Sequence, residues 1–357
     1  MQPPAKKWPV AILGATGAVG QTFVRLLEGH PWFELAEVAA SERSTGKSYR
    51  EAVSWIEGDL PERVAALPVV ACDPQSVTAP VVFSALDANV AGDIEAAFAR
   101  AGRVVFSNAK NHRMEPDVPL LIPEVNAPHL AALAVQRKRI GWKDRGAIIT
   151  NANCATTAAV IPLAPLHEAF GIEQVFIVTM QAVSGAGYPG VPSLDILGNV
   201  IPYIADEEAK IERELPKMLG QWTGAAIVPA SIGVSAHANR VPVEHGHTVC
   251  LTVKLKTRAT AADAHTALES WRGHAEARDL PSALERPIIV SDDPRRPQPR
   301  RDAGRGNGMA VTVGRIRPDR LWDLRLVALA HNVVRGAAGG SVFNAELMAA
   351  RGELPAT

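Results

Sequence analysis

The first 150 residues alternate short apolar runs with segments of helical periodicity. The opening run WPVAILGA leads through a glycine-rich turn into GAVGQTFVRLLEG, where Val19, Phe23, Leu26 and Leu27 would share one helical face. Further apolar runs follow at intervals: ELAEVAAS, APVVFSAL, RVVFSN and GAIITN. Continuous apolar strands separated by helices predict a parallel sheet with helices on both faces, which is the doubly wound, Rossmann-like α/β architecture.

The second half of the chain has a different pattern. After a helical stretch that ends near Phe170, long β-rich runs dominate: IEQVFIVTMQAV, GAAIVPASIGVSA, HTVCLTVKL, GMAVTVGRI and LWDLRLVALA. Such runs predict an α+β domain with a mostly antiparallel sheet. We therefore expect one domain over residues 1–152 and a second over 153–330. The small and apolar residues of 331–357 predict a terminal helix that packs back and completes the first domain.

Composition and charge argue against several classes of protein. Lysine plus arginine equals aspartate plus glutamate, 37 against 37, so no net charge favours nucleic acid or a membrane as partner. No apolar run approaches the roughly 20 residues that span a bilayer, and the N-terminal sequence does not resemble a secretory signal. The three cysteines are widely spaced and form no CxxC pair, which disfavours disulfides or a bound metal and favours a cytoplasmic location.

The segment GATGAVG lies between the first expected strand and the first expected helix. Glycines there allow a tight turn and let the diphosphate of a dinucleotide rest on the amides of the helix N-terminus. The sequence therefore predicts a dinucleotide site. Its candidate cofactor-binding residues are Gly14, Thr16, Gly17, Ala18 and Val19.

The end of the second expected strand distinguishes the two nicotinamide cofactors. An NAD-binding protein usually has an acidic residue there, which binds the ribose 2′-hydroxyl. Here the strand runs into Ser41, Glu42, Arg43 and Ser44. Because a cation flanked by two hydroxyls suits a 2′-phosphate, we expect NADP, bound by Ser41, Arg43 and Ser44. Glu42 leaves NAD open as an alternative, since its carboxylate could reach the ribose.

The segment TNANCATT joins the last expected strand of the first domain to a helix, and it places Cys154 in the first helical turn. There the helix dipole and the free amides would lower the pKa of the thiol, at the sheet edge that faces the cofactor. Cys72 and Cys250 lie in apolar surroundings and are interpreted as structural. A thiolate beside a nicotinamide can add to an aldehyde, and hydride loss then leaves an acyl thioester for a second nucleophile.

Several long motifs resemble the aspartate-semialdehyde dehydrogenase family, in particular its fungal and archaeal branch. They include GATGAVG, ASERSTGK, SNAKNHRM, NANCATT, MQAVSGAGYPGVPSLDILGNVIPYI, NRVPVEHGHT and HNVVRGAAGG. The resemblance covers nearly the whole chain. It implies NADPH-dependent reductive dephosphorylation of 4-aspartyl phosphate to L-aspartate 4-semialdehyde through a cysteine thioester, in lysine, methionine and threonine biosynthesis. It also implies that residues 1–152 bind the dinucleotide and that 153–330 carry catalysis and dimerisation.

The resemblance also assigns roles to individual residues. It makes Cys154 the nucleophile, His247 the acid/base and Gln181 the residue that orients the thioester. The substrate-binding residues are Arg240 for the α-carboxylate, Glu207 for the amino group, and Lys210, Arg113 and Asn153 for phosphate. Further candidates for cofactor binding are Ser184, Gly185 and Asn332.

Some alternatives remain open at this level. Glu208 competes with Glu207, because Ala209 interrupts an acidic run typical of the family and Asp206 stands where glycine is common. His245, two residues from His247, would face the same side of a strand. An acyl-CoA reductase of the malonyl-CoA type, or a non-catalytic NADP sensor, could use the same scaffold. The family forms dimers and tetramers, so we expect a homodimer or homotetramer.

Overall fold

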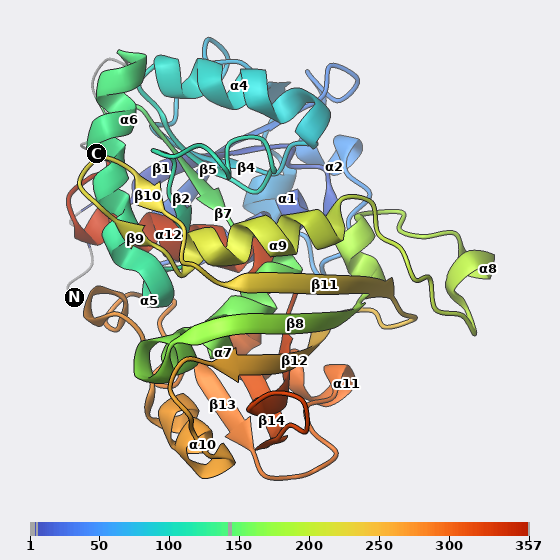
Figure 1. Cartoon of the computed structure of the whole chain (residues 1–357). Helices are drawn as coiled ribbons and strands as arrows, with labels where there is room; N and C mark the ends of the chain where they lie inside the picture. Colours follow the sequence, from blue (N-terminus) through green and yellow to red (C-terminus); the bar gives the residue numbers. More distant parts are fainter. Residues whose placement is uncertain (1–3, 5, 142–144, 356–357) are drawn as a thin grey trace.

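Two β-sheets organise the chain, and the computed structural model describes residues 4, 6–141 and 145–355 (Figure 1). The first sheet is wholly parallel, with strand order β3-β2-β1-β4-β5-β7-β6. Its strands are β1 (Trp8–Leu13), β2 (Phe33–Ala40), β3 (Val69–Ala71), β4 (Val81–Ser84), β5 (Val104–Ser107), β6 (Leu120–Leu121) and β7 (Ala147–Asn151). The helices between them are α1 (Ala18–Leu27), α2 (Tyr49–Ala52), α3 (Glu62–Ala65), α4 (Ala88–Arg100), α5 (Pro123–Asn126) and α6 (Leu133–Ile140).

Both faces of this sheet are buried, which explains the continuous apolar runs. On one face Ile12 of β1 belongs to a core with Phe23 of α1 and Phe343 of α12 (Gly339–Ala350). On the other face the neighbouring Leu13 belongs to a core with Phe98 of α4. The terminal helix α12 thus packs on the first sheet, against β5 and β7.

The second sheet is mixed and mostly antiparallel, as the sequence predicts, with strand order β11-β8-β12-β15-β14-β13. The three central pairings are antiparallel, whereas the two outer ones, β11 with β8 and β13 with β14, are parallel. Its strands are β8 (Ile172–Gln181), β11 (Gly233–Arg240), β12 (His247–Leu255), β13 (Ile288–Ser291), β14 (Val311–Pro318) and β15 (Leu324–Ala330).

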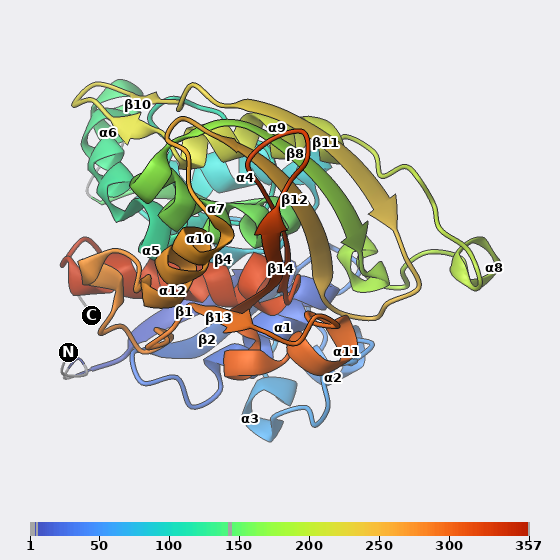
Figure 2. The same cartoon turned by 60° about the horizontal axis from the view of Figure 1, so that its bottom comes forward.

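Helices cover one face of the second sheet. They are α7 (Cys154–Phe170), α9 (Glu207–Met218) and α10 (Ala261–Ser270). Along β12, Val249, Leu251 and Val253 are buried in the core under these helices, whereas Cys250 and Thr252 alternate with them and are only partly buried. The other face of this sheet therefore has few helices over it, as Figure 2 shows for β8, β11 and β12.

One local feature differs from the sequence pattern. The run GAAIVPASIGVSA is not one strand: β10 (Ile227–Val228) pairs with β9 (Gln221–Trp222), and β11 begins at Gly233. Pro229 has no N–H group, so it cannot continue the ladder of β10. As the sequence predicts, α7 ends at Phe170, and it continues through Pro162 and Pro165.

The remaining elements are short. They are η1 (Ala127–Ala132), η2 (Val183–Ala186), α8 (Ser193–Ile196), η3 (Ala275–Ala277), α11 (Pro299–Asp302), η4 (Arg305–Gly308) and the π-helical turn η5 (Val334–Ala338). The segment that carries α8 projects away from the body of the molecule (Figure 1 and Figure 2). Among the described residues, no helix is both long and apolar enough to cross a membrane.

Candidate active site

The glycine turn lies where the strand order of the first sheet reverses, between β1 and its neighbour β4. Gly14 has φ +73°, and a Cβ atom on it would lie 2.7 Å from the carbonyl oxygen of Ala85, at the end of β4. Gly17 is the N-cap of α1, and no side chain bonds the amides of the first turn there. Free amides at the carboxyl edge of a parallel sheet, beside the point of strand reversal, fit the diphosphate of a dinucleotide.

The predicted cofactor residues near this turn fall into two groups. Thr16, Ala18 and Val19 belong to the turn or to the first turn of α1. The others follow the carboxyl end of β2, where Ser41 and Arg43 are exposed and Ser44 is partly exposed. Glu42 is exposed beside them. The second group therefore offers a cation and hydroxyls at the position where a ribose would lie.

Cys154 is the first residue of α7, and its side chain is paired with a histidine from the second sheet. The Sγ atom lies 3.1 Å from Nε2 of His247, the first residue of β12. The other ring nitrogen of His247, Nδ1, accepts the N–H of Ala182 at 3.1 Å. His247 is completely buried, and Cys154 is partly exposed. Cys154 is thus the more exposed residue of the pair.

Burial determines the protonation state of this pair. It raises the pKa of Cys154 to about 12, an effect that the Glu207 carboxylate adds to and that Arg113, Arg240 and the N–H of Ala155 oppose. The expectation of a lowered thiol pKa is therefore wrong for the free protein, because desolvation outweighs the helix N-terminus. Burial also lowers the pKa of His247 to about 3, together with the charges of Arg240 and His331. A neutral thiol faces a neutral imidazole at pH 7.

Asn153, the N-cap of α7, connects the nucleophile to α9. Its amide oxygen accepts the N–H groups of Ala155 and Thr156, which fixes the first turn of the helix. Its Nδ2 donates to Oε1 of Glu207 at 2.8 Å, and its backbone N–H donates to Oε2 of Glu214 at 2.7 Å. Two carboxylates of α9 therefore hold the residue that precedes Cys154.

The two candidate glutamates of α9 point to different places. Glu207 is buried against Asn153 and also pairs with Nζ of Lys210 at 3.2 Å. Glu208 accepts the backbone N–H of Ala238 at 3.0 Å, on strand β11. The position beside the nucleophile is therefore occupied by Glu207.

Two predicted substrate arginines are buried within electrostatic range of Cys154. Arg113 is buried, and its Nη1 donates to Oε1 of Glu214 at 2.8 Å. Arg240, the last residue of β11, donates through Nη1 to the carbonyl oxygen of Ala182 at 2.8 Å. Its register partner on β8 is Gln181, which is also buried. The charge of Arg240 affects the pKa of both Cys154 and His247, so it lies within electrostatic range of the pair.

A second network joins the remaining predicted residues next to His247. Ser184 Oγ accepts the side-chain amide of Asn332 at 2.8 Å, and the amide oxygen of Asn332 accepts the N–H of Gly246. His245 lies 3.0 Å from the same Ser184 oxygen. Strand alternation does not relate His245 to His247, because β12 begins only at His247 and Gly246 has φ +100°. His245 therefore belongs to the rim of the site.

Glycines allow close approaches around the reacting atoms. A Cβ atom on Gly185 would lie 2.9 Å from Nη1 of Arg240 and 3.0 Å from Cε1 of His247. A Cβ atom on Gly336 would lie 2.7 Å from Cβ of Cys154. Gly336 belongs to η5, which packs against both α1 and α7. The helix of the glycine turn and the helix of the nucleophile therefore meet at one element.

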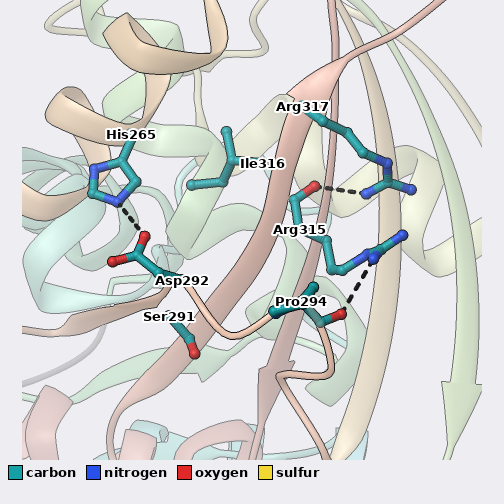
Figure 3. Close-up of a pocket in the computed structure, with 7 residues that line it drawn as sticks. All are labelled: His265, Ser291, Asp292, Pro294, Arg315, Ile316 and Arg317. Atoms are coloured by element: carbon teal, nitrogen blue, oxygen red, sulfur yellow. Dashed lines mark hydrogen bonds and ion pairs between the residues drawn. The ribbon is translucent and has the colours of Figure 1, made fainter.

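A hollow of about 260 Å³ lies away from the Cys154 cluster, between α10, β13 and β14 (Figure 3). Arg315 and Arg317 donate there to the backbone carbonyls of Pro294 and Arg315, and His265 lies 3.2 Å from Asp292. These groups are satisfied locally, and the hollow does not include any residue of the Cys154 cluster.

Comparison with known proteins identifies the family. Residues 9–133 match the model described as "Semialdehyde dehydrogenase, NAD binding domain", and residues 163–335 match "Semialdehyde dehydrogenase, dimerisation domain". An aspartate-semialdehyde dehydrogenase of Archaeoglobus fulgidus is 49% identical over 343 residues, which cover 96% of this chain and 98% of that protein. The chain belongs to the aspartate-semialdehyde dehydrogenase family. A further family member, from Schizosaccharomyces pombe, is 48% identical over 351 residues, 96% of this chain and 98% of that protein.

A solved structure agrees with this membership. The aspartate semialdehyde dehydrogenase of Candida albicans with NADP superimposes with a TM-score of 0.89 at 43% identity, covering 97% of this chain and 99% of that one. The family resemblance and the α/β fold with a second, dimerisation domain, both predicted from the motifs and patterns, are thereby confirmed.

Sequence reasoning missed several residues that support the site in this family member. Glu214 bridges Asn153 and Arg113, and Nζ of Lys217 donates to the carbonyl oxygens of Arg113, Glu115 and Val118. One signal was available: Glu207, Lys210, Glu214 and Lys217 follow at intervals of three and four, which places them on one face of a helix. Nothing in the sequence indicated the contact of Ala182 or Gly336 with the site.

Proposed function

We propose that the chain is an aspartate-semialdehyde dehydrogenase that reduces 4-aspartyl phosphate to L-aspartate 4-semialdehyde and phosphate with NADPH. The observation that carries the proposal is the pairing of Cys154 with His247 at the start of α7, surrounded by Arg240, Glu207 and Arg113. Family membership over nearly the full length of the chain supports the same activity. The expected role is in amino-acid biosynthesis.

The chemistry that the chain supplies is easiest to follow in the oxidative direction. The sulfur of Cys154 adds to the aldehyde carbon, and the thiol proton passes to the carbonyl oxygen, which becomes the hydroxyl of a hemithioacetal. The Nε2–H of His247 donates a hydrogen bond to this oxygen, which lies beside sulfur. NADP, when bound, would supply the hydride acceptor, and the hydroxyl proton would leave to water as the thioester forms. A phosphate oxygen attacks the thioester carbon, the C–S bond breaks, the sulfur regains a proton from the phosphate, and the acyl phosphate leaves.

The charged groups around the pair suit each end of the proposed substrate. Arg240 would bind the α-carboxylate through its fork of donors, and Glu207 would bind the amino group. Lys210 and Arg113 would bind phosphate with Asn153, and Gln181 would orient the thioester. Two sets of contacts support these roles. Glu207 accepts a hydrogen bond from the side chain of Asn153. Arg113 donates to Glu214, which also accepts the backbone N–H of Asn153.

We further propose NADP as the cofactor, bound at the glycine turn by Gly14, Thr16, Gly17, Ala18 and Val19, at the ribose by Ser41, Arg43 and Ser44, and near the nicotinamide by Ser184, Gly185 and Asn332. The Candida albicans relative was solved with NADP, which supports this assignment. The last group is connected by hydrogen bonds to Gly246, next to His247. The cofactor would thus lie along one path from α1 to the catalytic pair.

The alternative activities make different demands on the site. An acyl-CoA reductase would use the same cysteine, but it would not need a buried carboxylate for a substrate amino group, and Glu207 is such a carboxylate. A non-catalytic sensor would not need a nucleophile, and Cys154 is present at the helix start. The relatives described above are all named as aspartate-semialdehyde dehydrogenases.

The experiment is to measure phosphate-dependent reduction of NADP with L-aspartate 4-semialdehyde. Without phosphate the acyl-enzyme should accumulate, and peptide mass spectrometry should find the aspartyl group on Cys154. Cys154→Ser should abolish turnover, whereas the matched variant Cys72→Ser should keep it. Activity on an acyl-CoA with none on the semialdehyde, or full turnover by Cys154→Ser, would overturn the proposal.

We propose a homodimer or homotetramer. The matched dimerisation domain supports self-association, and so do the exposed apolar side chains of the projecting segment, Leu194 at 92% and Tyr203 at 69% exposure. Light scattering after size-exclusion chromatography tests the oligomeric state, with Leu194→Asp expected to give a smaller particle.

We also propose that residues 1–152 together with 331–357 bind the cofactor and that residues 153–330 carry catalysis and dimerisation. We further propose a cytoplasmic location.

A further inference from the structure

Asn151, the last residue of β7, lies three positions before Cys154 and is almost completely buried. The proposed mechanism does not use its side chain. One terminal atom of its amide has the carbonyl oxygens of Ala337 at 3.0 Å and Gly336 at 3.3 Å as neighbours. Oδ1 of Asn108 lies 3.2 Å from the same atom. Because backbone carbonyls only accept hydrogen bonds, this atom is Nδ2, and Asn151 is a donor to η5.

The π-helical geometry of η5 explains why its carbonyls need such a donor. The N–H groups of Gly336 and Ala338 bond to the carbonyl oxygens of His331 and Val333, five positions earlier. A π-turn interrupts the regular pairing of an α-helix, and turns of this kind are frequent at functional sites. Buried carbonyls that lose a helical partner require another one. The amide of Asn151 supplies it from a neighbouring element.

Two glycines bring the same turn into contact with the nucleophile. A Cβ atom on Gly336 would lie 2.7 Å from Cβ of Cys154, and one on Gly340 would lie 2.8 Å from Oδ1 of Asn151. The segment around η5 therefore touches the chain on both sides of the two residues that separate Asn151 from Cys154. The place of the nucleophile depends on how closely η5 approaches the junction of β7 and α7.

A second, independent contact holds η5. Nη2 of Arg335 donates to Oε2 of Glu124, on α5, at 2.8 Å, and both side chains are buried. The guanidinium also lies over the ring of Phe343, 5.8 Å from its centroid. Because this ion pair does not involve Asn151, loss of the Asn151 amide should loosen the contact of η5 with the nucleophile without unfolding the turn.

We propose that Asn151 is a positioning residue for the reaction. Its amide clamps η5 against the junction of β7 and α7, and so it fixes Sγ of Cys154 at its distance from Nε2 of His247. Asn151 acts through Cys154 rather than on the substrate. The effect on turnover rests on the proposed function, whereas the effect on the thiol does not.

Asn151→Asp tests the clamp, because it replaces the donor by an acceptor of the same shape and sets a carboxylate against three oxygens. A displacement of about 1 Å at a reacting group can cost 10²-fold in rate, so kcat should fall about 10- to 100-fold. The KM values for the semialdehyde and for phosphate should stay within about twofold. Alkylation of Cys154 by iodoacetamide, which needs no turnover, should slow at least about threefold.

Acid should partly restore the activity of Asn151→Asp. Burial raises the pKa of a carboxyl group, and the protonated form has one O–H that can donate to a carbonyl of η5. The ratio of kcat in this variant to that in the wild type should therefore rise as the pH falls from 8 to 6. Asn151→Ala has no donor at any pH, so its ratio should stay constant and low. It also provides the test of kcat and alkylation if Asn151→Asp does not fold.

Asn344→Asp is the matched control for stability. Asn344, on α12, is also buried, and its Nδ2 donates to the carbonyl oxygen of Leu121 at 3.3 Å. Both Asn→Asp variants should lower the temperature of thermal unfolding, but only Asn151→Asp should change kcat and alkylation. Wild-type kcat and alkylation in both Asn151 variants, or an equal loss in Asn344→Asp, would overturn the inference and leave Asn151 a residue of the fold alone.

The two readouts separate this inference from the proposed function. If the wild type lacks phosphate-dependent turnover but the Asn151 variants still slow the alkylation of Cys154, the proposed function fails and the positioning role stands. If the wild type turns over and the Asn151 variants turn over and react with iodoacetamide as it does, the positioning role fails and the function stands.

Discussion

His247 presents Nε2 to Sγ of Cys154 at 3.1 Å, and it does so in one tautomer, because Nδ1 accepts the backbone N–H of Ala182. A backbone amide can only donate, so Nδ1 must be unprotonated and the ring proton lies on Nε2. The ring thus serves Cys154 as a hydrogen-bond donor. An imidazolium would place two N–H groups against each other, which agrees with the low pKa of His247, about 3.

The first prediction concerns this tautomer. In protein labelled with ¹⁵N at histidine, His247 should remain neutral with its proton on Nε2 from pH 8 down to pH 5. His247→Asn should lower kcat by about 10²- to 10³-fold, the range for loss of one hydrogen-bond donor to a developing oxyanion. A titration of His247 with a midpoint near pH 6.5, or a proton on Nδ1, would contradict the proposed role as a donor.

The second prediction concerns Gly336. An added Cβ would lie 2.7 Å from Cβ and 2.9 Å from Cα of Cys154, so Gly336→Ala must displace the nucleophile. Because a shift of about 1 Å at a reacting group can cost 10²-fold in rate, we expect kcat to fall about 100-fold. The rate of alkylation of Cys154 should change in parallel with kcat. The dissociation constant for NADP should stay within about twofold of the wild-type value, since Gly336 lies by the thiol.

Gly304→Ala is the matched control for this change. Gly304 has a right-handed helical backbone and nothing within 4 Å of the added atom. It should behave as wild type in kcat, alkylation and thermal unfolding. Wild-type kcat in Gly336→Ala would mean that Cys154 accommodates the methyl group without loss of geometry.

The sequence predicts the parts of this molecule that depend on local pattern. The two-sided burial of β1 follows from a continuous apolar run, and the start of α7 at Cys154 follows from Asn153, a residue that favours the N-cap. The glycine turn depends on strand, turn and helix in immediate succession. Each of these features is contained within about fifteen residues, so it can be recognised without knowledge of the tertiary structure.

The features that escaped prediction depend on segments far apart in the chain. Glu214 meets Asn153 across 61 positions, and Gly336 meets Cys154 only because η5 packs on α7. Helix periodicity cannot distinguish Glu207 from Glu208 until the rotation of α9 against Asn153 and β11 is known. The pKa of Cys154 was predicted in the wrong direction for the same reason. Sequence shows the helix N-terminus but not the burial that outweighs it.

The third prediction concerns the choice of cofactor. Arg43 is exposed at the carboxyl end of β2, and a 2′-phosphate would gain a charge-assisted bond from it. Removing such a bond costs about 1.5–3 kcal/mol, so Arg43→Ala should raise the KM for NADP about ten- to a hundredfold. The KM for NAD should stay within about twofold. Glu42→Gln, one position away, is the control for local charge, and equal changes for both cofactors in Arg43→Ala would contradict the assignment.

The fourth prediction concerns the stability of the fold at acid pH. Burial, helped by the charges of His245 and Arg25, lowers the pKa of His331 to about 4. The folded protein therefore binds fewer protons than the unfolded chain, whose histidines titrate near 6.5. The stability that this group contributes is complete above pH 6.5 and is lost as the pH falls toward 4. The free energy of unfolding should decrease by up to about 1.4 kcal/mol per pH unit for each such histidine.

His331→Asn tests this directly. The Nδ1 atom of His331 accepts the N–H groups of Val333 and Val334, and the side-chain oxygen of asparagine can accept the same bonds without titrating. The variant should match wild type in urea unfolding at pH 7.5 and should lose less stability between pH 6.5 and 4.5. His265→Asn is the control, because His265 lies partly exposed on α10. If both variants reduce the pH dependence of the free energy of unfolding equally, burial of His331 is not the cause of that dependence, because a surface histidine would then have the same effect.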